Sequence, residues 1–120
     1  MPIVDVEIVL KENETIPENL SSNFANELGR IFNSPSNSTW VKVRGLSAHQ
    51  YAENGETRKD VLPVFVRVIK SKILKGEIQK EAEQIAVVVA NICDRPAENI
   101  HIIYEPDGSG RVAFGGKLIA

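Results

Sequence analysis

Apolar residues gather in short runs that have the length and composition of β-strands. Ile3–Leu10 and Val64–Ile69 are rich in Val and Ile, which pack well on a pleated sheet surface. Trp40–Arg44 and Ile100–Tyr104 have the same character, and Val112–Ile119 follows a Pro-Asp-Gly turn signal. The pattern predicts four main strands and a shorter C-terminal strand.

Two longer segments repeat their apolar residues at helical spacing. The first runs from Pro17, a residue favoured in the first turn of a helix, to about Phe32, and the second from Glu77 to Cys93. The apolar stripe of the first segment has four members: Leu20, Phe24, Leu28 and Ile31. That of the second has six: Ile78, Ala82, Ile85, Val88, Val89 and Ile92. This spacing predicts two amphipathic helices.

The order of these elements repeats once along the chain. Pro2 falls on Pro63 and Pro35 falls on Pro96, each pair being 61 positions apart. No gap is needed between the two prolines of each half, which favours an ancient duplication over chance. Each half then consists of a strand, a helix and a second strand.

We therefore expect residues 1–120 to form a single domain of two pseudo-repeats, about 2–62 and 63–120. A right-handed crossover joins the two parallel strands of each β-α-β unit. The expected fold is α/β, or more narrowly α+β: a two-layer sandwich with a four-stranded mixed sheet and two helices on one face. The strands are apolar at both odd and even positions, which predicts that other subunits of a homo-oligomer bury the second sheet face.

Composition narrows the partners and the compartment. The formal net charge of −2 gives no basic footprint for nucleic acid, and no apolar segment approaches the roughly 20 residues that cross a bilayer. Cys93 is the single cysteine, which excludes an internal disulfide and favours a reducing, cytoplasmic location. Neither His49 nor His101 has neighbours at metal-ligand spacing, so we expect no metal and no nucleic-acid or membrane partner.

The candidate chemistry starts at Pro2, directly behind the initiator Met1. Removal of Met1 would leave a secondary amine at the start of an apolar strand. An unperturbed α-amino group has a pKa of about 7.7–8.0, and an apolar pocket lowers it. Such an amine is suited to act as a general base. The alternative is that Pro2 only begins a strand. Retention of Met1, which makes the Pro2 nitrogen an uncharged amide, would favour this alternative.

These features together resemble the tautomerase superfamily, especially its migration-inhibitory-factor-like and 5-carboxymethyl-2-hydroxymuconate-isomerase-like branches. The resemblance rests on the second-position proline, the duplicated β-α-β halves and the size of the chain, and it covers essentially the whole sequence. It implies a homotrimer in which Pro2 lies near a subunit boundary. It also implies keto–enol proton transfer on a small carbonyl or keto acid, without metal or organic cofactor.

Residue by residue, the resemblance is mixed. Pro2 matches the base of the family pattern, and Val112-Ala113-Phe114 resembles the C-terminal stretch that forms an apolar or aromatic pocket wall, which makes Phe114 a candidate. His101 stands where migration-inhibitory-factor-like proteins have a pocket Tyr, and Ile103 where they have an Asn. His101 could hydrogen-bond a substrate oxygen or could equally be a structural histidine. These departures weaken any claim to the same substrate.

Three cations stand at the end of the third predicted strand: Arg67, Lys70 and Lys72. By the family pattern this region borders the pocket, where cations can hold a carboxylate and stabilise an enolate oxygen. Each lysine taken singly also fits an ordinary solvated surface position. Arg67 alternates with apolar neighbours and is expected to need an acidic partner, with Asp5 and Glu7 as candidates.

Two other functions stay open. A hydratase or decarboxylase of the same superfamily would need a water-positioning carboxylate beside Phe114, and Ala113 stands there. A non-enzymatic trimer that binds a ligand or a protein is the second alternative, and retention of Met1 would favour it.

Overall fold

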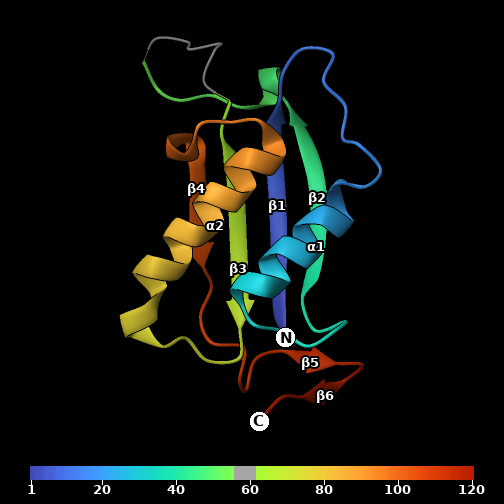
Figure 1. Ribbon diagram of the computed structural model, residues 1–120, viewed down its shortest axis with the longest axis vertical. Helices are drawn as coiled ribbons and strands as arrows, with labels where there is room; N and C mark the ends of the chain where they lie inside the picture. The colour runs from blue at the N-terminus through green and yellow to red at the C-terminus, as the bar shows by residue number, and fades with distance from the viewer. Residues whose placement is uncertain (56–61) are drawn as a thin grey trace.

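The computed structural model describes residues 1–55 and 62–120 and has two layers, one of strands and one of helices (Figure 1). The first half of the chain supplies β1 (Pro2–Leu10), α1 (Leu20–Ile31) and β2 (Trp40–Ser47). The second half supplies β3 (Val64–Lys70), α2 (Ile78–Cys93) and β4 (Ile100–Tyr104). Two short strands, β5 (Ala113–Phe114) and β6 (Lys117–Leu118), form a separate hairpin. The end of the first predicted pseudo-repeat includes residues 56–61, which lie outside the described residues.

The four long strands form one mixed sheet in the order β2-β1-β3-β4. β1 pairs with β2 and β3 with β4 in parallel, whereas the two central strands, β1 and β3, run antiparallel. Both helices lie on the same face of this sheet (Figure 1). The predicted α+β sandwich with a four-stranded mixed sheet is therefore confirmed.

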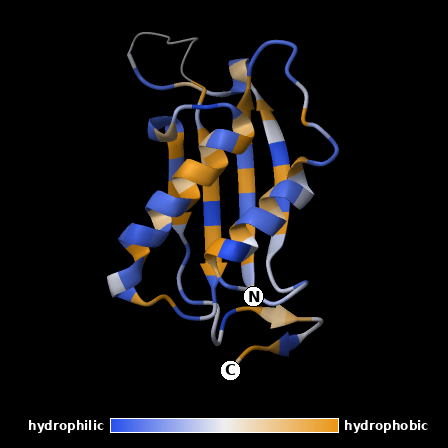
Figure 2. Cartoon of the chain, in the orientation of Figure 1, coloured by the Kyte–Doolittle hydropathy of each residue, from blue (hydrophilic) through white to orange (hydrophobic). Residues whose placement is uncertain are grey.

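The core lies between the sheet and the helices. Alternate residues of the central strands point to the helices and are almost fully buried: Val4, Val6, Val64, Val66 and Val68. The helices pack their apolar stripes against these strand residues. The fully buried members of the stripes are Phe24, Leu28, Ile85 and Val89. Figure 2 shows this alternation as orange and blue bands along the strands. Each such side chain contributes about 1.5–3 kcal/mol relative to an exposed position, so this interface dominates the stability of the fold.

The other sheet face, called the outer face below, is more polar than the sequence suggested. Between β1 and β2, Asp5 Oδ1 lies 3.1 Å from Lys42 Nζ and Glu7 Oε2 lies 3.1 Å from Arg44 Nε. These pairs lie directly opposite one another in the β1–β2 register. The outer face is therefore mixed, with ion pairs between its apolar side chains.

The acidic partner that we predicted for Arg67 was wrong. Arg67 Nη1 lies 2.6 Å from Glu105 Oε1, just beyond the end of β4. Asp5 does stand opposite Arg67 in the β1–β3 register. However, Asp5 pairs with Lys42, which lies on its other side on β2. The hydrophobic pattern of the sequence does not indicate which of the two cations Asp5 contacts.

Strand β2 continues to Ser47, beyond the predicted Arg44, and two other elements also differ from the sequence prediction. The first helix begins at Leu20 rather than Pro17, because the segment between them forms a turn in which Leu20 N–H donates to Pro17 O at 3.1 Å. The predicted C-terminal strand is a hairpin, since Gly115 and Gly116 turn the chain with φ of 57° and 88°. Glycine adopts two successive positive φ values without a Cβ clash, and this geometry suits a two-residue hairpin turn.

Candidate active site at the start of strand β1

Pro2 is the first residue of β1 and is buried at the end of the sheet that adjoins the β5–β6 hairpin (Figure 1). It pairs with Lys70, the last residue of β3. A proline fits the first position of a central strand because its missing N–H costs no ladder hydrogen bond there. The sequence therefore places the Pro2 nitrogen at the sheet end rather than within the ladder.

Met1 packs between Pro2 and the turn after β4. Ser71 Oγ lies 3.9 Å from Met1 Sδ, at the far limit of a sulfur hydrogen bond. Gly108 N–H donates to Lys70 O at 2.7 Å, and a Cβ built on Gly108 would lie 2.5 Å from Met1 Cε and 3.2 Å from Lys70 O. The close approach of this turn to the end of β3 therefore depends on glycine at position 108. With Met1 attached, the Pro2 nitrogen is a tertiary amide and has no basic lone pair.

Lys70 points into the helix layer and takes part in a cluster that we call the Lys70 network, made of Lys70, Phe32, Glu81 and Tyr104. Lys70 Nζ donates to Glu81 Oε1 at 2.8 Å and lies 5.3 Å from the centre of the Phe32 ring. Tyr104 OH donates to Glu81 Oε2 at 2.6 Å. Burial, and then the Glu81 carboxylate, raises the pKa of the Tyr104 phenol, so it remains a donor.

An aromatic pair stands on the other side of Pro2. Trp40 begins β2 and is paired with Ile3 in the β1–β2 register. The Phe114 ring meets the Trp40 ring edge to face, with 5.1 Å between centres. Trp40 Nε1 donates to Asn37 O at 2.9 Å, which fixes the indole. The hairpin thus carries Phe114 to Trp40, at the end of the sheet where Pro2 lies.

The remaining predicted site residues lie apart from Pro2 within one chain. Lys72 is exposed in the segment after β3 and forms no ion pair in the parts of the chain that the structure describes. Arg67 and His101 lie on the outer face, where the His101 ring packs 5.6 Å from that of Phe65. Phe65 is paired with His101 and precedes Lys70 by five residues on β3, which separates His101 from Pro2 by about 16 Å along the strands.

Sequence reasoning missed three residues of this region. Trp40, the only tryptophan of the chain, was placed at a strand start without a role in the site. Glu81 and Tyr104 were not singled out, since nothing in their spacing from Lys70 announces a contact. The one signal available was their position in the predicted elements: Glu81 lies in the first turn of a helix, and Tyr104 ends an apolar strand.

The other reactive side chains give no second centre. Cys93 is buried at the end of α2, and burial raises the pKa of its thiol to about 11, so it is unreactive near neutral pH. Across residues 1–55 and 62–120, no three His, Cys, Asp or Glu side chains stand close enough to hold a metal ion. No helix in the same residues is long and apolar enough to cross a membrane.

The chain matches no protein-family model and no curated protein sequence. Its architecture, however, is the fold of solved macrophage migration inhibitory factor and 4-OT structures.

Three solved structures illustrate the likeness. The macrophage migration inhibitory factor of Trichinella spiralis superposes with a TM-score of 0.75 at 14% identity, over 97% of this chain and 98% of that chain. A fused 4-OT, described as a wild type asymmetric trimer, gives 0.78 at 12% identity over 97% and 94%. Pt0534, inactivated by 2-oxo-3-pentynoate, gives 0.76 at 10% identity over 98% and 96%. The resemblance inferred from the sequence is confirmed at the level of the fold.

Proposed function

We propose that this protein is a cofactor-independent tautomerase in which Pro2, after removal of Met1, is the general base for keto–enol isomerisation of a small carbonyl acid. The observation that carries the proposal is the place of Pro2: it is buried at the sheet end, between the Lys70 network and the Trp40–Phe114 pair. The shared fold with 4-OT and Pt0534 supports it.

The proposed reaction needs only one proton-transfer group. Removal of Met1 frees the amine and the space against Gly108 and Ser71. The neutral amine of Pro2 takes a proton from the carbon next to a ketone, the electron pair of the C–H bond becomes the enolate π bond, and negative charge develops on oxygen. The proton then returns to a different atom of the substrate. Phe114 and Trp40 exclude water and thereby keep the amine neutral.

A homotrimer completes the proposed site. Lys72 is free to meet a substrate carboxylate from the same chain, whereas Arg67 and His101 reach the site only from the outer face of a neighbouring copy. The description of the fused 4-OT as a trimer supports this assembly. A single buried cysteine fits a reducing, cytoplasmic location.

The first experiment combines intact mass, ketonisation of phenylenolpyruvate and 2-hydroxymuconate, and treatment with 2-oxo-3-pentynoate. We expect a mass lower by one Met residue, measurable turnover, and addition of one molecule of the alkynyl ketone through a bond from the Pro2 nitrogen to an alkyne carbon. Pro2→Ala, which still permits Met1 removal, should lower kcat/KM by about 10²-fold or more. Unchanged turnover in Pro2→Ala would refute the proline base.

A trimeric, non-enzymatic binding protein is the second candidate, and one observation favours it. Met1 fits the available space, with its Sδ beside Ser71 and its Cε against Gly108. If native protein keeps Met1 and shows no turnover, the nitrogen is blocked and the binding function takes precedence. The hydratase alternative has less support because Ala113, exposed beside Phe114, supplies no carboxylate.

A further inference from the structure

Lys70 is poorly placed to bind a substrate carboxylate. Its side chain is only 25% exposed, and its ammonium is already paired with the 14% exposed Glu81. The same ammonium lies over the face of Phe32, on the helix side of the sheet. A substrate anion would therefore compete with an existing, largely buried carboxylate. The role of Lys70 must be sought in what it does to its neighbours.

The nearest neighbour across the sheet is Pro2. Pro2 and Lys70 are directly opposite each other in the antiparallel β1–β3 register, where facing Cα atoms are about 4.5–5.5 Å apart. Glu81 lies on the far side of Lys70, since its second oxygen accepts from Tyr104 on β4. The strand order β1-β3-β4 therefore puts the strand that carries Lys70 between Pro2 and the strand whose Tyr104 contacts the carboxylate.

We propose that Lys70 is a positioning residue whose charge, fixed by Glu81, keeps the processed Pro2 amine in its neutral, basic form. A cation disfavours a second positive charge beside it, whereas the more distant Glu81 carboxylate partly offsets that effect. The inference rests on the proposed function in one respect, namely that the free Pro2 amine is the base.

The other groups around the start of β1 have little effect on the charge state of the Pro2 amine. Phe32 at the C-cap of α1, Trp40 from β2, and Ser71 carry no charge, and the Tyr104 phenol on β4 stays protonated. Asp107, in the turn after β4, accepts from Ile73 N–H at 2.9 Å, and none of the variants compared below changes this contact. Lys72 is exposed, so solvent and salt screen it.

The test measures the pKa of the Pro2 amine directly, by NMR titration of processed protein labelled with ¹⁵N-proline and free of substrate. Methionine aminopeptidase supplies the processed form if the native protein keeps Met1. Four proteins are compared: wild type, Lys70→Gln, Glu81→Gln and the double variant. Lys72→Gln is the matched control, because it removes an exposed charge two residues away.

We expect the pKa of Pro2 to rise in the order Glu81→Gln, wild type, double variant, Lys70→Gln. The step from wild type to Lys70→Gln should be about one unit, the effect of one partly screened charge across two adjacent strands, and Lys72→Gln should shift it less. The double variant removes both charges. Its difference from Glu81→Gln measures the effect of the Lys70 charge alone, and its difference from Lys70→Gln measures the effect of a Glu81 carboxylate that has lost its cation.

A pKa in Lys70→Gln equal to that of wild type, with both proteins folded, would overturn the inference. The titration needs no turnover, so the electrostatic inference and the proposed function can fail separately. Ordered pKa values without tautomerase activity would uphold the electrostatic role and reject the enzyme. Tautomerase activity with unchanged pKa values would support the enzyme and reject the electrostatic role of Lys70. In an active enzyme, the acidic limb of kcat/KM should move by the same amount as the pKa.

Discussion

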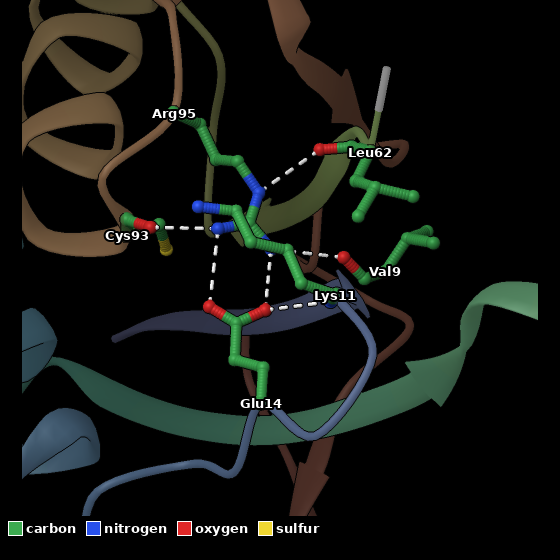
Figure 3. A network of polar contacts seen from close by, with 6 residues as sticks. All are labelled: Val9, Lys11, Glu14, Leu62, Cys93 and Arg95. Carbon is green, nitrogen blue, oxygen red and sulfur yellow. Dashed lines mark hydrogen bonds and ion pairs between the residues drawn. The ribbon is translucent and has the colours of Figure 1, made fainter. Parts of the chain in front are cut away.

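The two ends of the sheet each carry a largely buried ion pair. The pairs differ in how many of the N–H groups of the cation donate a hydrogen bond. At the end away from Pro2, Arg95 forms what we call the Arg95 network (Figure 3). Its five N–H groups donate to the Glu14 carboxylate at 2.7 and 3.2 Å and to three backbone carbonyls, those of Val9, Leu62 and Cys93. Its side chain is 3% exposed. An arginine has five N–H donors, so none is left over.

The Lys70 network is less complete. Lys70 has three N–H donors, and Glu81 accepts from its ammonium, while Phe32 offers only its ring face. Lys70 can therefore adjust when a neighbour changes charge. Arg95 cannot, because any movement leaves carbonyl groups without a partner.

This difference suggests different roles for the two networks: the Arg95 network in stability and the Lys70 network in the proposed function. The Arg95 network ties the loop after β1, the end of β1, the segment just before β3 and the end of α2 into one unit, so it holds the two halves of the chain together. The Lys70 network adjoins the residue with candidate chemistry. A saturated network is suited to a structural role, whereas the Lys70–Glu81 pair, which leaves donors unused beside Pro2, is suited to the tuning proposed above.

The largest expected effect is that of Arg95→Met. Removal of the cation leaves the Glu14 charge and three buried carbonyls without their donor, which should cost about 3–5 kcal/mol of the free energy of unfolding. Urea denaturation measures it, with the exposed Arg111→Met as control. The turnover of the remaining folded protein should stay near wild type. A loss below about 1 kcal/mol would mean that the network behaves like a surface pair.

Glu14→Gln should have a smaller, pH-dependent effect. The hydrogen bonds from Arg95 hold the pKa of Glu14 below its ordinary value of 4.5. A lowered folded-state pKa stabilises the fold above the unfolded value, and this contribution disappears as the pH falls through the folded value. At pH 7, loss of the charge-assisted bonds should cost about 1.5–3 kcal/mol.

Urea midpoints of wild type and Glu14→Gln between pH 7 and pH 3 give the check. The gap between the two proteins should be constant down to about pH 5 and should narrow below pH 4.5. Glu12→Gln, an exposed change on the same loop, controls for the general effect of acid. A gap that does not narrow would show that the Glu14 charge contributes nothing beyond packing.

The same contrast explains what the sequence could predict. The strands and helices were found because their signal is local: runs of Val and Ile, and apolar stripes at helical spacing. Duplication and crossover handedness predicted a four-stranded sheet with both helices on one face, whereas the strand order β2-β1-β3-β4 became known only from the structure. The C-terminal strand was misjudged because Gly115 and Gly116 were not recognised as the turn of a two-residue hairpin.

The polar networks could not be predicted, because each depends on backbone placement. Arg95 bonds to carbonyl groups from three separate segments, and a carbonyl has no sequence signature. Glu81 meets Lys70 only because the crossover brings the first turn of α2 over the end of β3. The partner of Arg67 depended on strand register. Of the candidate site, the sequence supplied Pro2 and Phe114 but not Trp40, Glu81 or Tyr104.

The smallest expected effect concerns the ion pairs of the outer face. The Arg44 side chain is 63% exposed and that of Glu7 32%, so Arg44→Met should change the free energy of unfolding by only about 0.2–1 kcal/mol. The measurement pairs urea denaturation with sedimentation equilibrium, and Lys42→Met on the same strand is the matched variant.

A loss of several kcal/mol accompanied by dissociation would place the Arg44–Glu7 pair in a dry interface between copies. The outer face would then resemble the saturated Arg95 network rather than a solvated surface. A small change in an intact oligomer would leave these charges in water, and the contact between copies would then fall on the apolar residues of the same face, such as Ile3 and Ile69. Under the proposed homotrimer, either result shows which outer-face side chains would hold the copies together, and therefore whether His101 of one copy can approach Pro2 of the next.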